Sequence, residues 1–485
     1  MLSADVIVVG AGPTGLMLAC ELALAGVRCR VLERRAEEPN ITRAFAVHAR
    51  TLELLDARGL AGEVLLQGVK VPQVAPVPGA VLNLAELPTP YPMILIVPQS
   101  GTEKVLRARA ERLGVPIVRG AEVVGLRQDD SGVELEIGGP SPRTERARYV
   151  VGCDGAHSAV RRLVGVDFVG KQYETHILLA DMRLDDPPPD GLYAATNTQG
   201  AVVAVPFGDG WYRTIAWDRL REQVPLDVPV TRAEMADAFT RIAGTDLGMG
   251  EPRWSTRFLS ERRQARRYRV GRVFLAGDAA HVHSPLGGQG MNTGIQDAMN
   301  LGWKLAAAVH GRTPAGLLDS YEGERHPVGA RVLALTDLFN QLVLGHSRIR
   351  KAAQWLAIRT ILRFGRTRRL IGGRLTGIGI AYPRPRGAHR WVGRRLPDLT
   401  CGGTRLYEAM RDGRFLLVVP PGTDAGGADL VHVVDCAPAA GRPAAFLVRP
   451  DGYVAWASTG PPATAAVASA VTHWCGAATQ PVHSG

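Results

Sequence analysis

Short apolar runs alternate with helical runs along the first half of the chain, a pattern typical of α/β proteins. Residues 5–9 form a nearly continuous apolar run that predicts a buried strand, and apolar residues at helical spacing follow over 16–25. Further apolar runs at 27–32, 149–152 and 273–276 predict more buried strands. We therefore expect a Rossmann-like sheet with helices packed on its faces.

Alternating apolar and polar residues replace these runs in the middle of the chain and predict antiparallel strands. Residues 115–119, 122–128 and 133–137 alternate around a turn at 130–132. Alternating segments recur between 168 and 265, where they predict a second, antiparallel sheet domain. The strands expected there are 176–184, 200–206 and 212–218.

The last third of the chain changes character twice. Residues 347–370 are strongly basic and contain Trp and Leu, which favours a solvated helix covering the second domain over a helix at a membrane interface. A stretch rich in proline and arginine at 383–395 is typical of a linker. Strands are then expected at 415–419, 431–435, 444–448 and 453–456, with a closing helix from Thr464. These elements predict a small α/β domain without an evident catalytic set.

Composition narrows the class of protein. A length of 485 residues exceeds one hydrophobic core, so two or three domains are expected. The net charge of +11 comes from scattered Arg pairs without a long lysine block, which favours anionic small ligands over nucleic acid. Without a signal peptide or an apolar run of about 18 residues, we expect a cytoplasmic protein with no transmembrane segment. The six cysteines lack Cys-x-x-Cys and zinc spacing, so buried free thiols and no metal site are expected.

The first candidate site is a dinucleotide fingerprint in its full context of strand, G-x-G-x-x-G, helix, strand and acidic residue. Gly10, Gly12 and Gly15 stand at the three positions, with Pro13 and Thr14 between them. Glu33, 18 residues after Gly15, is placed to accept hydrogen bonds from a ribose. This pattern does not separate FAD from NAD. Arg34 is kept as a cofactor candidate, although an exposed charge after a strand is the simpler interpretation.

The chain is organised around a second candidate site, residues 272–292, with the sequence RVFLAGDAAHVHSPLGGQGMN. A strand leads to Asp278, a glycine loop follows, and a helix starts at about Met291. A carboxylate, bare backbone amides and a helix N-terminus together suit a polyol that carries an electron-rich oxygen beyond it. A ribityl chain followed by an isoalloxazine ring fits this description. The alternative is a structural turn with glycines for packing.

Other residues are candidates for the ligand region. Arg43 lies in a loop where a cation can meet the cofactor or substrate, whereas His48 and Arg50 are equally compatible with structural roles. Apolar and aromatic side chains of the second sheet can face a flat apolar ligand, but about half of them must instead pack inside the protein. These residues are Leu178, Met182, Tyr193, Val203, Val205, Phe207, Thr214 and Trp217.

The motifs together resemble the group A flavoprotein aromatic monooxygenases, built like para-hydroxybenzoate hydroxylase. The resemblance covers essentially the whole chain and rests on several motifs in the same order. These are Gly10–Gly15, Val97-Pro98-Gln99, Cys153-Asp154-Gly155, Gly277-Asp278, Gly287–Asn292 and Gly302-Trp303-Lys304-Leu305. The segment 448–456 is similar to that of aromatic polyketide hydroxylases and rifampicin monooxygenases, whose C-terminal domain is thioredoxin-like without the redox Cys-x-x-Cys.

The resemblance implies roles for individual residues. Gly10, Gly12, Gly15 and Glu33 would hold the ADP half of a non-covalent FAD, and Gln99 and Asp278 its ribityl and pyrophosphate region. Asp154 belongs to a motif linked to FAD and NADPH. Arg43 would lie near the flavin and the substrate path, while Pro285 and the amides of Gly288, Gly290, Met291 and Asn292 would line the ring. Arg43, Pro285 and Gly288 are thus expected nearest the reacting atoms.

The implied activity is hydroxylation of a polycyclic phenolic, polyketide-like compound with NAD(P)H and O2, through a flavin C4a-hydroperoxide. An antibiotic-inactivating or Baeyer–Villiger oxygenase, or a flavin-binding redox sensor, are the alternatives. The protein would be a monomer or a homodimer. The implied FAD-binding domain comprises 1–68, 97–167 and 266–330. The substrate domain comprises an excursion at 69–96, the sheet at 168–265 and helices at 331–385, and a thioredoxin-like domain covers 396–485.

Overall fold

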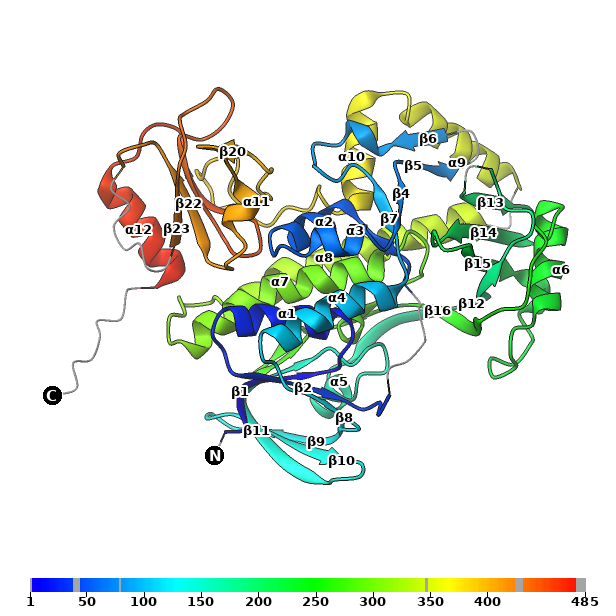
Figure 1. Cartoon of the computed structure of the whole chain (residues 1–485), viewed down its shortest axis with the longest axis horizontal. Helices are drawn as coiled ribbons and strands as arrows, with labels where there is room; N and C mark the ends of the chain where they lie inside the picture. The colour runs from blue at the N-terminus through cyan, green and yellow to red at the C-terminus, as the bar shows by residue number, and fades with distance from the viewer. Residues whose placement is uncertain are drawn as a thin grey trace.

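The computed structural model describes residues 2–37, 44–77, 80–189, 191–344, 348–423 and 431–476 (Figure 1). Two sheets and their helices form the body of the protein, and a smaller sheet domain at the C-terminal end packs beside them. Among the described residues, no helix is both long and apolar enough to cross a membrane.

The first sheet has the strand order β17-β18-β11-β1-β2-β8, with the hairpin β9-β10 joined through β11. Its strands are β1 (Ala4–Val9), β2 (Cys29–Glu33), β8 (Ile117–Arg119), β9 (Glu122–Gln128), β10 (Val133–Gly138), β11 (Arg143–Gly152), β17 (Arg269–Val270) and β18 (Val273–Leu275). All six residues of β1 are buried, because parallel neighbours flank it and both faces are covered. The interpretation of 115–119 as antiparallel was wrong, since β8 pairs in parallel with β2.

Three helices lie together over this sheet (Figure 1). They are α1 (Pro13–Leu24), α4 (Gln99–Arg112) and α7 (Gln289–Val309). α1 and α7 approach closely because glycines line their contact: a Cβ at Gly294 would lie 2.2 Å from Thr14 Oγ1, and one at Gly302 would lie 2.7 Å from Glu21 Cβ. The short helix α5 (Ala159–Leu163) follows β11. The N-terminal ends of α1 and α7 are thereby held near one another.

The second sheet is antiparallel, with the order β13-β14-β15-β12-β16-β19. Its strands are β12 (Phe168–Arg183), β13 (Tyr193–Thr196), β14 (Gly200–Pro206), β15 (Trp211–Asp218), β16 (Trp254–Ala265) and β19 (His281–Val282). Helix α6 (Arg232–Ala243) covers one face, where Met235 and Phe239 are fully buried. The edge strand β19 comes from the stretch around Asp278, so one continuous segment serves both sheets.

The remaining elements of the body close the other face. They are β3 (Ala46–Val47), β4 (Val69–Val71), β5 (Gln73–Val77), β6 (Ala80–Asn83), β7 (Ile94–Ile96), α2 (Ala49–Asp56), α3 (Ala61–Leu65), α8 (Asp319–Leu344), α9 (Arg348–Ile361) and α10 (Gly365–Thr376), with 3-10 turns η1 (Leu84–Glu86), η2 (Arg219–Arg221) and η3 (Gly277–Ala279). The basic stretch predicted as one helix is thus two, α9 and α10. Leu362, Leu375 and Ile378 pack under them against Val205 and Phe207.

The C-terminal domain has a four-stranded sheet in the order β23-β22-β24-β25. Its elements are β20 (Thr400–Cys401), β21 (Thr404–Arg405), α11 (Leu406–Ala409), β22 (Phe415–Val419), β23 (Val431–Asp435), β24 (Ala445–Val448), β25 (Val454–Ser458) and α12 (Thr464–Cys475). The expectation of six free thiols was wrong, because Cys401 and Cys436 form a disulfide with their Cα atoms 4.9 Å apart. Only the fold brings these residues together across 35 positions. The other four cysteines are free.

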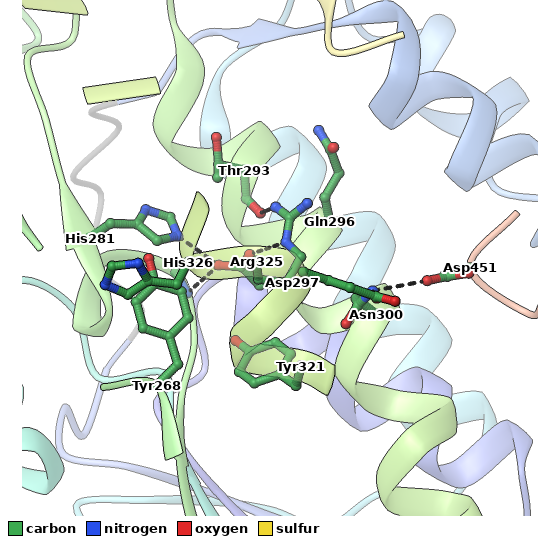
Figure 2. Close-up of polar contacts among 12 residues, drawn as sticks. Tyr268, His281, Thr293, Gln296, Asp297, Asn300, Tyr321, Arg325, His326 and Asp451 are labelled. Carbon is green, nitrogen blue, oxygen red and sulfur yellow. Dashed lines mark hydrogen bonds and ion pairs between the residues drawn. The ribbon is translucent and has the colours of Figure 1, made fainter. Parts of the chain in front are cut away.

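A buried polar network, the C-terminal clamp, joins this domain to the body. Arg449 donates to Glu324 Oε1 of α8 (2.6 Å) and to Asp451 Oδ2 (2.5 Å), and Lys304 of α7 donates to Glu324 Oε2 (2.9 Å). Asn300 of α7 donates to Asp451 Oδ2 (3.1 Å; Figure 2). Burial lowers the pKa of Lys304 to about 8, although Glu324 partly offsets this effect. The turn between β24 and β25 is therefore fixed on α7 and α8.

Candidate functional site

In the turn after β1, backbone atoms take the space that side chains would otherwise fill. Gly10 has a φ of 108°, and a Cβ there would lie 2.4 Å from the carbonyl oxygen of Cys153. A Cβ at Gly15 would lie 2.0 Å from the carbonyl oxygen of Gly10. At Gly12, by contrast, no heavy atom of the described residues lies within 4 Å of the Cβ position. The fold itself requires Gly10 and Gly15, whereas Gly12 leaves open space at the N-terminus of α1.

Glu33 ends β2 beside this turn. Its Oε2 accepts a hydrogen bond from the amide of Ala11 (2.9 Å), and its Oε1 accepts one from the amide of Arg35 (3.0 Å). The carboxylate therefore holds the glycine turn in place as well as lying next to it. Arg34 is exposed on the surface. Pro13 is the first residue of α1, where its fixed φ suits a helix start.

A second turn, η3, carries the carboxylate predicted from the sequence. Gly277, with a φ of 62°, is so close to α1 that a Cβ there would lie 2.6 Å from Thr14 Oγ1. Gly277, Ala279 and Ala280 are buried, whereas Asp278 is exposed. The contact through Thr14 brings the open space at Gly12 and the carboxylate of Asp278 to the same edge of the first sheet.

Beneath this turn lies a buried ionic cluster that the sequence did not reveal (Figure 2). Asp297 of α7 accepts hydrogen bonds from the amide of Gly277 (3.0 Å), from His281 Nε2 (2.7 Å) and from Arg325 Nε (2.6 Å). All three side chains are fully buried. Burial alone would raise the pKa of Asp297, but Arg325 and His281 outweigh it and hold that pKa below its usual value. The cluster fixes the backbone of η3 from below.

The glycine loop 285–290 lies next to Asp278. Gly288 is the N-cap of α7 with a φ of 60°, and no side chain caps this helix end. The position of a Cβ at Gly290 lies 3.7 Å from Asp278 Oδ1, so the carboxylate and the helix N-terminus are neighbours. The first turn of α7 thus points backbone N–H groups, with the positive end of the helix dipole, toward Asp278. Pro285 opens the loop and its carbonyl accepts a hydrogen bond from the Gly288 amide (2.9 Å).

Two side chains fasten this loop to α2 and α10. Asn292 accepts from the amide of His48 (2.8 Å) and donates to the carbonyl oxygens of Ala46 (2.8 Å) and Gly288 (2.7 Å). Gln289 donates to the carbonyl oxygen of Leu375 (2.8 Å). The side chain of Asn292 is thus committed to the protein. Met291 is buried in the core of the first sheet.

His48 is the N-cap residue of α2 and is fully buried at the loop. Its Nδ1 lies 2.7 Å from the carbonyl oxygen of Leu375, whereas its Nε2 forms no hydrogen bond with a side chain or backbone group in the part of the chain that the structure describes. That Nε2 lies 3.5 Å from the position that a Cβ at Gly288 would take. Burial lowers the pKa of His48 to about 4. Backbone groups of Leu375 and Gly287 offset this effect only in part, so the imidazole is uncharged at neutral pH and lies beside the loop.

The structure describes three of the four other sequence candidates. Gln99 starts α4, accepts from the amide of Ala44 (3.1 Å) and donates to Glu103 (2.7 Å). Asp154 accepts from Ser158 Oγ and from the Val160 amide, so it holds the start of α5. Arg43 lies outside the described residues, and Arg50 turns away to pair with Glu53.

One face of the second sheet is directed at the glycine loop. Its cluster, the loop-facing cluster, contains Ile177, Leu179, Ala201, Ile215 and Trp217, with Phe45, Val203, Trp254, Phe258 and Leu286 packed against it. Val205 and Phe207 lie beside it, under α10. Trp217 is buried, and its Nε1 has no hydrogen-bond partner among the described residues. A fully buried ion pair borders the cluster, in which Arg213 Nε lies 2.6 Å from Asp181 Oδ1 and the guanidinium faces Phe45, Phe207 and Trp254.

The other four proposed pocket residues lie on the opposite face. Leu178, Met182 and Tyr193 pack in the core beneath α6. Thr214 is buried and donates to the carbonyl oxygen of Ala180, which belongs to the same core. These residues are not part of the loop-facing cluster. The sequence missed Phe45, Trp254 and Leu286, which come from three separate segments and carry no shared pattern.

A basic groove of about 940 Å³ opens between β12, β16 and α8. Lys171, Arg262, Arg266 and Arg267 line it, together with Gln264 and His326. Its floor is close to η3, because Gln264 pairs with His281 of β19 and the amide of Ala265 donates to the carbonyl oxygen of Ala280 (2.8 Å). The groove thus adjoins the turn that carries Asp278.

The glycine turn, η3 and the N-terminus of α7 lie next to one another along the edge of the first sheet. Open space at Gly12 adjoins Thr14, Thr14 adjoins Gly277, and Asp278 adjoins Gly290 and the N-terminus of α7. Open backbone at a helix N-terminus suits a pyrophosphate, an exposed carboxylate suits ribityl hydroxyls, and a second helix N-terminus suits an electron-rich ring oxygen. The residues present therefore fit FAD.

Comparison with known proteins also indicates an FAD-binding protein. Residues 3–336 match the family described as FAD binding domain, and residues 389–478 match the aromatic-ring hydroxylase C-terminal family. A rifampicin monooxygenase of Streptomyces venezuelae is 43% identical over 462 residues, covering 93% of this chain and 95% of the relative. A dialkyldecalin synthase of Streptomyces rugosporus is 37% identical and covers 94% of this chain and 96% of the relative.

Solved structures agree. The structure of an anhydrotetracycline hydroxylase from Streptomyces rimosus superposes with a TM-score of 0.87 at 39% identity, covering 98% of this chain and 99% of that chain. Both family matches, the whole-length relatives and the mixed α/β architecture point the same way. The chain belongs to the FAD-dependent aromatic-ring monooxygenases of the para-hydroxybenzoate hydroxylase fold.

Proposed function

We propose that this enzyme uses NAD(P)H and O2 to hydroxylate a polycyclic phenolic, polyketide-like compound held between the glycine loop and the second sheet. The observation that carries the proposal is the loop-facing cluster: aromatic and aliphatic side chains from the second sheet meet Leu286 of the glycine loop and Phe45. A flat apolar ring system matches such a surface, and the buried Nε1 of Trp217 offers it one hydrogen-bond donor. Two whole-length relatives are named for monooxygenation of rifampicin and of anhydrotetracycline.

Bound FAD would supply the redox chemistry, in which NAD(P)H is oxidised, one oxygen atom of O2 goes to the aromatic ring and the other leaves as water. The chain's own residues would support this chemistry. The uncapped N-terminus of α7 stabilises negative charge beside Gly290, and the buried cluster under η3 keeps Asp278 in place. The loop-facing cluster excludes water from the reacting atoms.

We propose that His48 accepts a hydrogen bond from the substrate or the flavin at its Nε2. A pKa near 4 makes this imidazole a poor acceptor of a whole proton at neutral pH. It would therefore orient a hydroxyl or N–H group, and the electron density of the phenol itself would drive attack. Arg43, Pro285 and Gly288 remain our candidates for the residues nearest the reacting atoms, and Gln99 and Asp154 for support of the cofactor region.

We propose that the basic groove receives the phosphates of NAD(P)H, because its cations lie one strand away from η3. Replacing Arg267, which is exposed in the groove, by glutamate should raise the KM for NADPH about tenfold and leave kcat and FAD content unchanged. Arg384→Glu, an exposed charge outside the groove, is the matched control. An unchanged KM in Arg267→Glu would remove the groove from the proposal.

We also propose the domain division predicted from the sequence. Residues 1–68, 97–167 and 266–330 all contribute to the first sheet or its covering helices. The strand order and closing helix of 396–485 are compatible with a thioredoxin-like domain that has lost its redox pair.

The test of the function begins with the visible spectrum of the purified protein. NADPH oxidation is then measured with a panel of phenols, anthraquinones, tetracycline-like and ansamycin-like compounds. Stimulated oxidation with a product heavier by one oxygen supports the proposal, and the position of that oxygen separates ring hydroxylation from Baeyer–Villiger insertion. Bound FAD with no compound that stimulates oxidation would contradict the proposal, and so would conversion of a compound without oxygen uptake.

A further inference from the structure

The net positive charge of this protein does not come from the scattered Arg pairs, as the sequence first suggested, but from one segment, because Asp and Glu balance Lys and Arg in the rest of the chain. Residues 338–397 contain fourteen Lys and Arg and no Asp or Glu. Because the whole chain carries a net charge of +11, the remainder is slightly acidic. The segment forms the end of α8, helices α9 and α10 and the chain leading to the C-terminal domain. Such asymmetry indicates an anionic partner for this part of the surface.

Large apolar side chains are exposed among these charges. Leu356 is 66% exposed, Phe364 65%, Leu370 53% and Ile361 43%. Arg359, Arg363, Arg366, Arg369 and Arg374 are exposed beside them in the sequence. We call these nine residues the basic apolar face. In Figure 1, α9 and α10 lie at the periphery of the molecule over β5 and β6, on the side away from the first sheet.

Buried side chains and an ion pair hold α9 and α10 on the body of the protein. Leu362, Leu375 and Ile378 are buried beneath it, and Arg368 joins α10 to Glu86 of η1 (3.0 Å) and to the carbonyl oxygen of Leu362 (3.3 Å). The inward-facing side chains of α9 and α10 are therefore already satisfied by the protein. The exposed leucines and phenylalanine are left without a partner inside the protein.

The charged and apolar side chains of the basic apolar face favour one kind of binding partner over others. A second copy of this chain would bring Arg against Arg with no carboxylate between them, so self-association through this face is repulsive. An acidic protein would satisfy the arginines but would have to cover four protruding apolar tips as well. An anionic bilayer surface offers both partners at once, with phosphates for the arginines and acyl chains just below for Leu356, Ile361, Phe364 and Leu370.

We propose that the basic apolar face binds the surface of an anionic lipid bilayer, with α9 and α10 lying in its interface. The location couples this contact to the flavin site. The carbonyl oxygen of Leu375 in α10 accepts from His48 and Gln289 at the glycine loop, and Val205 and Phe207 pack under the same helix. A polycyclic apolar compound dissolved in the bilayer is thereby brought close to the loop-facing cluster.

The test is co-sedimentation of the FAD-loaded full-length protein with vesicles of phosphatidylcholine, either alone or with about one third phosphatidylglycerol. The wild type should partition to the anionic vesicles at least about tenfold better than to the neutral ones, and high salt should remove most of this preference. Arg363→Glu/Arg366→Glu should lose about tenfold or more of the binding, and Phe364→Ser should lose a smaller part.

The matched control is Arg384→Glu/Arg386→Glu, which makes the same change in net charge at exposed residues outside the face. It should bind like the wild type, and every variant should keep its FAD content and its melting temperature. Equal losses in the two double variants would show a general charge effect and overturn the proposal. A second result would also overturn the proposal: vesicle binding that is unchanged in Phe364→Ser and is abolished by added polyglutamate. The basic apolar face would then be a site for an acidic polypeptide.

Discussion

Replacing Gly12 by alanine should separate cofactor binding from folding. Gly12 has φ −75° and ψ 179°, a conformation that alanine adopts freely, and its Cβ position is open. The folded protein should therefore be as stable as the wild type or more stable by about 0.4–1 kcal/mol, since alanine lowers the entropy of the unfolded chain. The new methyl group would occupy the space proposed for the pyrophosphate. Loss of two charge-assisted hydrogen bonds, each worth about 1.5–3 kcal/mol, corresponds to an FAD affinity lower by about two to four orders of magnitude.

The assay is titration of the apoprotein with FAD by flavin fluorescence, paired with thermal unfolding of the apoprotein. Gly62→Ala, in α3, is the control, because its Cβ position is also open and lies away from the turn. Gly10→Ala gives the opposite result, with an unstable protein, since its Cβ would clash with the carbonyl oxygen of Cys153. Unchanged FAD affinity in Gly12→Ala would refute the assignment of the pyrophosphate to this turn.

Three further predictions follow from buried groups. Asp297→Ala should destabilise the protein by about 3–5 kcal/mol and weaken FAD binding, because Arg325 is left buried without its partner. Urea unfolding measures the stability and FAD titration the affinity, and an unchanged value of both would contradict the role of the cluster. Burial lowers the pKa of His48 from 6.5 to about 4, so the unfolded chain binds a proton at a higher pH than the folded protein does. As the pH falls from 6.5 to 4, the free energy of unfolding of the wild type should therefore decrease by about 2–3 kcal/mol more than that of His48→Gln. Above pH 6.5 the two proteins should show the same dependence on pH. Cys401→Ser should lower the free energy of unfolding by about 2–4 kcal/mol, and the unreduced, denatured wild type should alkylate at four cysteines; alkylation at six would rule the disulfide out.

The motifs were readable from the sequence because they depend on local backbone. Gly10, Gly12 and Gly15 stand in a fixed strand-turn-helix unit, and Asp278 follows a buried strand directly, so near neighbours in the chain set their backbone conformation. The cluster of Asp297, His281 and Arg325 was not readable. Asp297 lies at an ordinary helical position, and only the crossing of α7, β19 and α8 shows that three charged or polar groups meet there.

The substrate side shows a different limit. In β12 the residues 177–180 are apolar on both faces, since one face meets α6 and the other meets the glycine loop. Alternation therefore identifies the strand without identifying the face, and Leu178 and Ile177 look equivalent in sequence. Trp217 and Thr214 differ by an odd number of positions in β15 and consequently point to opposite sides. The pairing of Cys401 with Cys436 was hidden for a related reason, because it depends on two strands that are not consecutive.

The C-terminal clamp requires residues that are far apart in the gene to match one another. Arg449 and Asp451 are buried against Glu324, Asn300 and Lys304, so a substitution on either side leaves a charge without its partner on the other. Relatives that exchange only their last ninety or so residues by recombination would combine mismatched halves of this network. Productive crossovers are therefore expected to carry the α7–α8 segment together with the C-terminal turn, and designers of chimeric enzymes can take that pair of segments as their smallest transferable part.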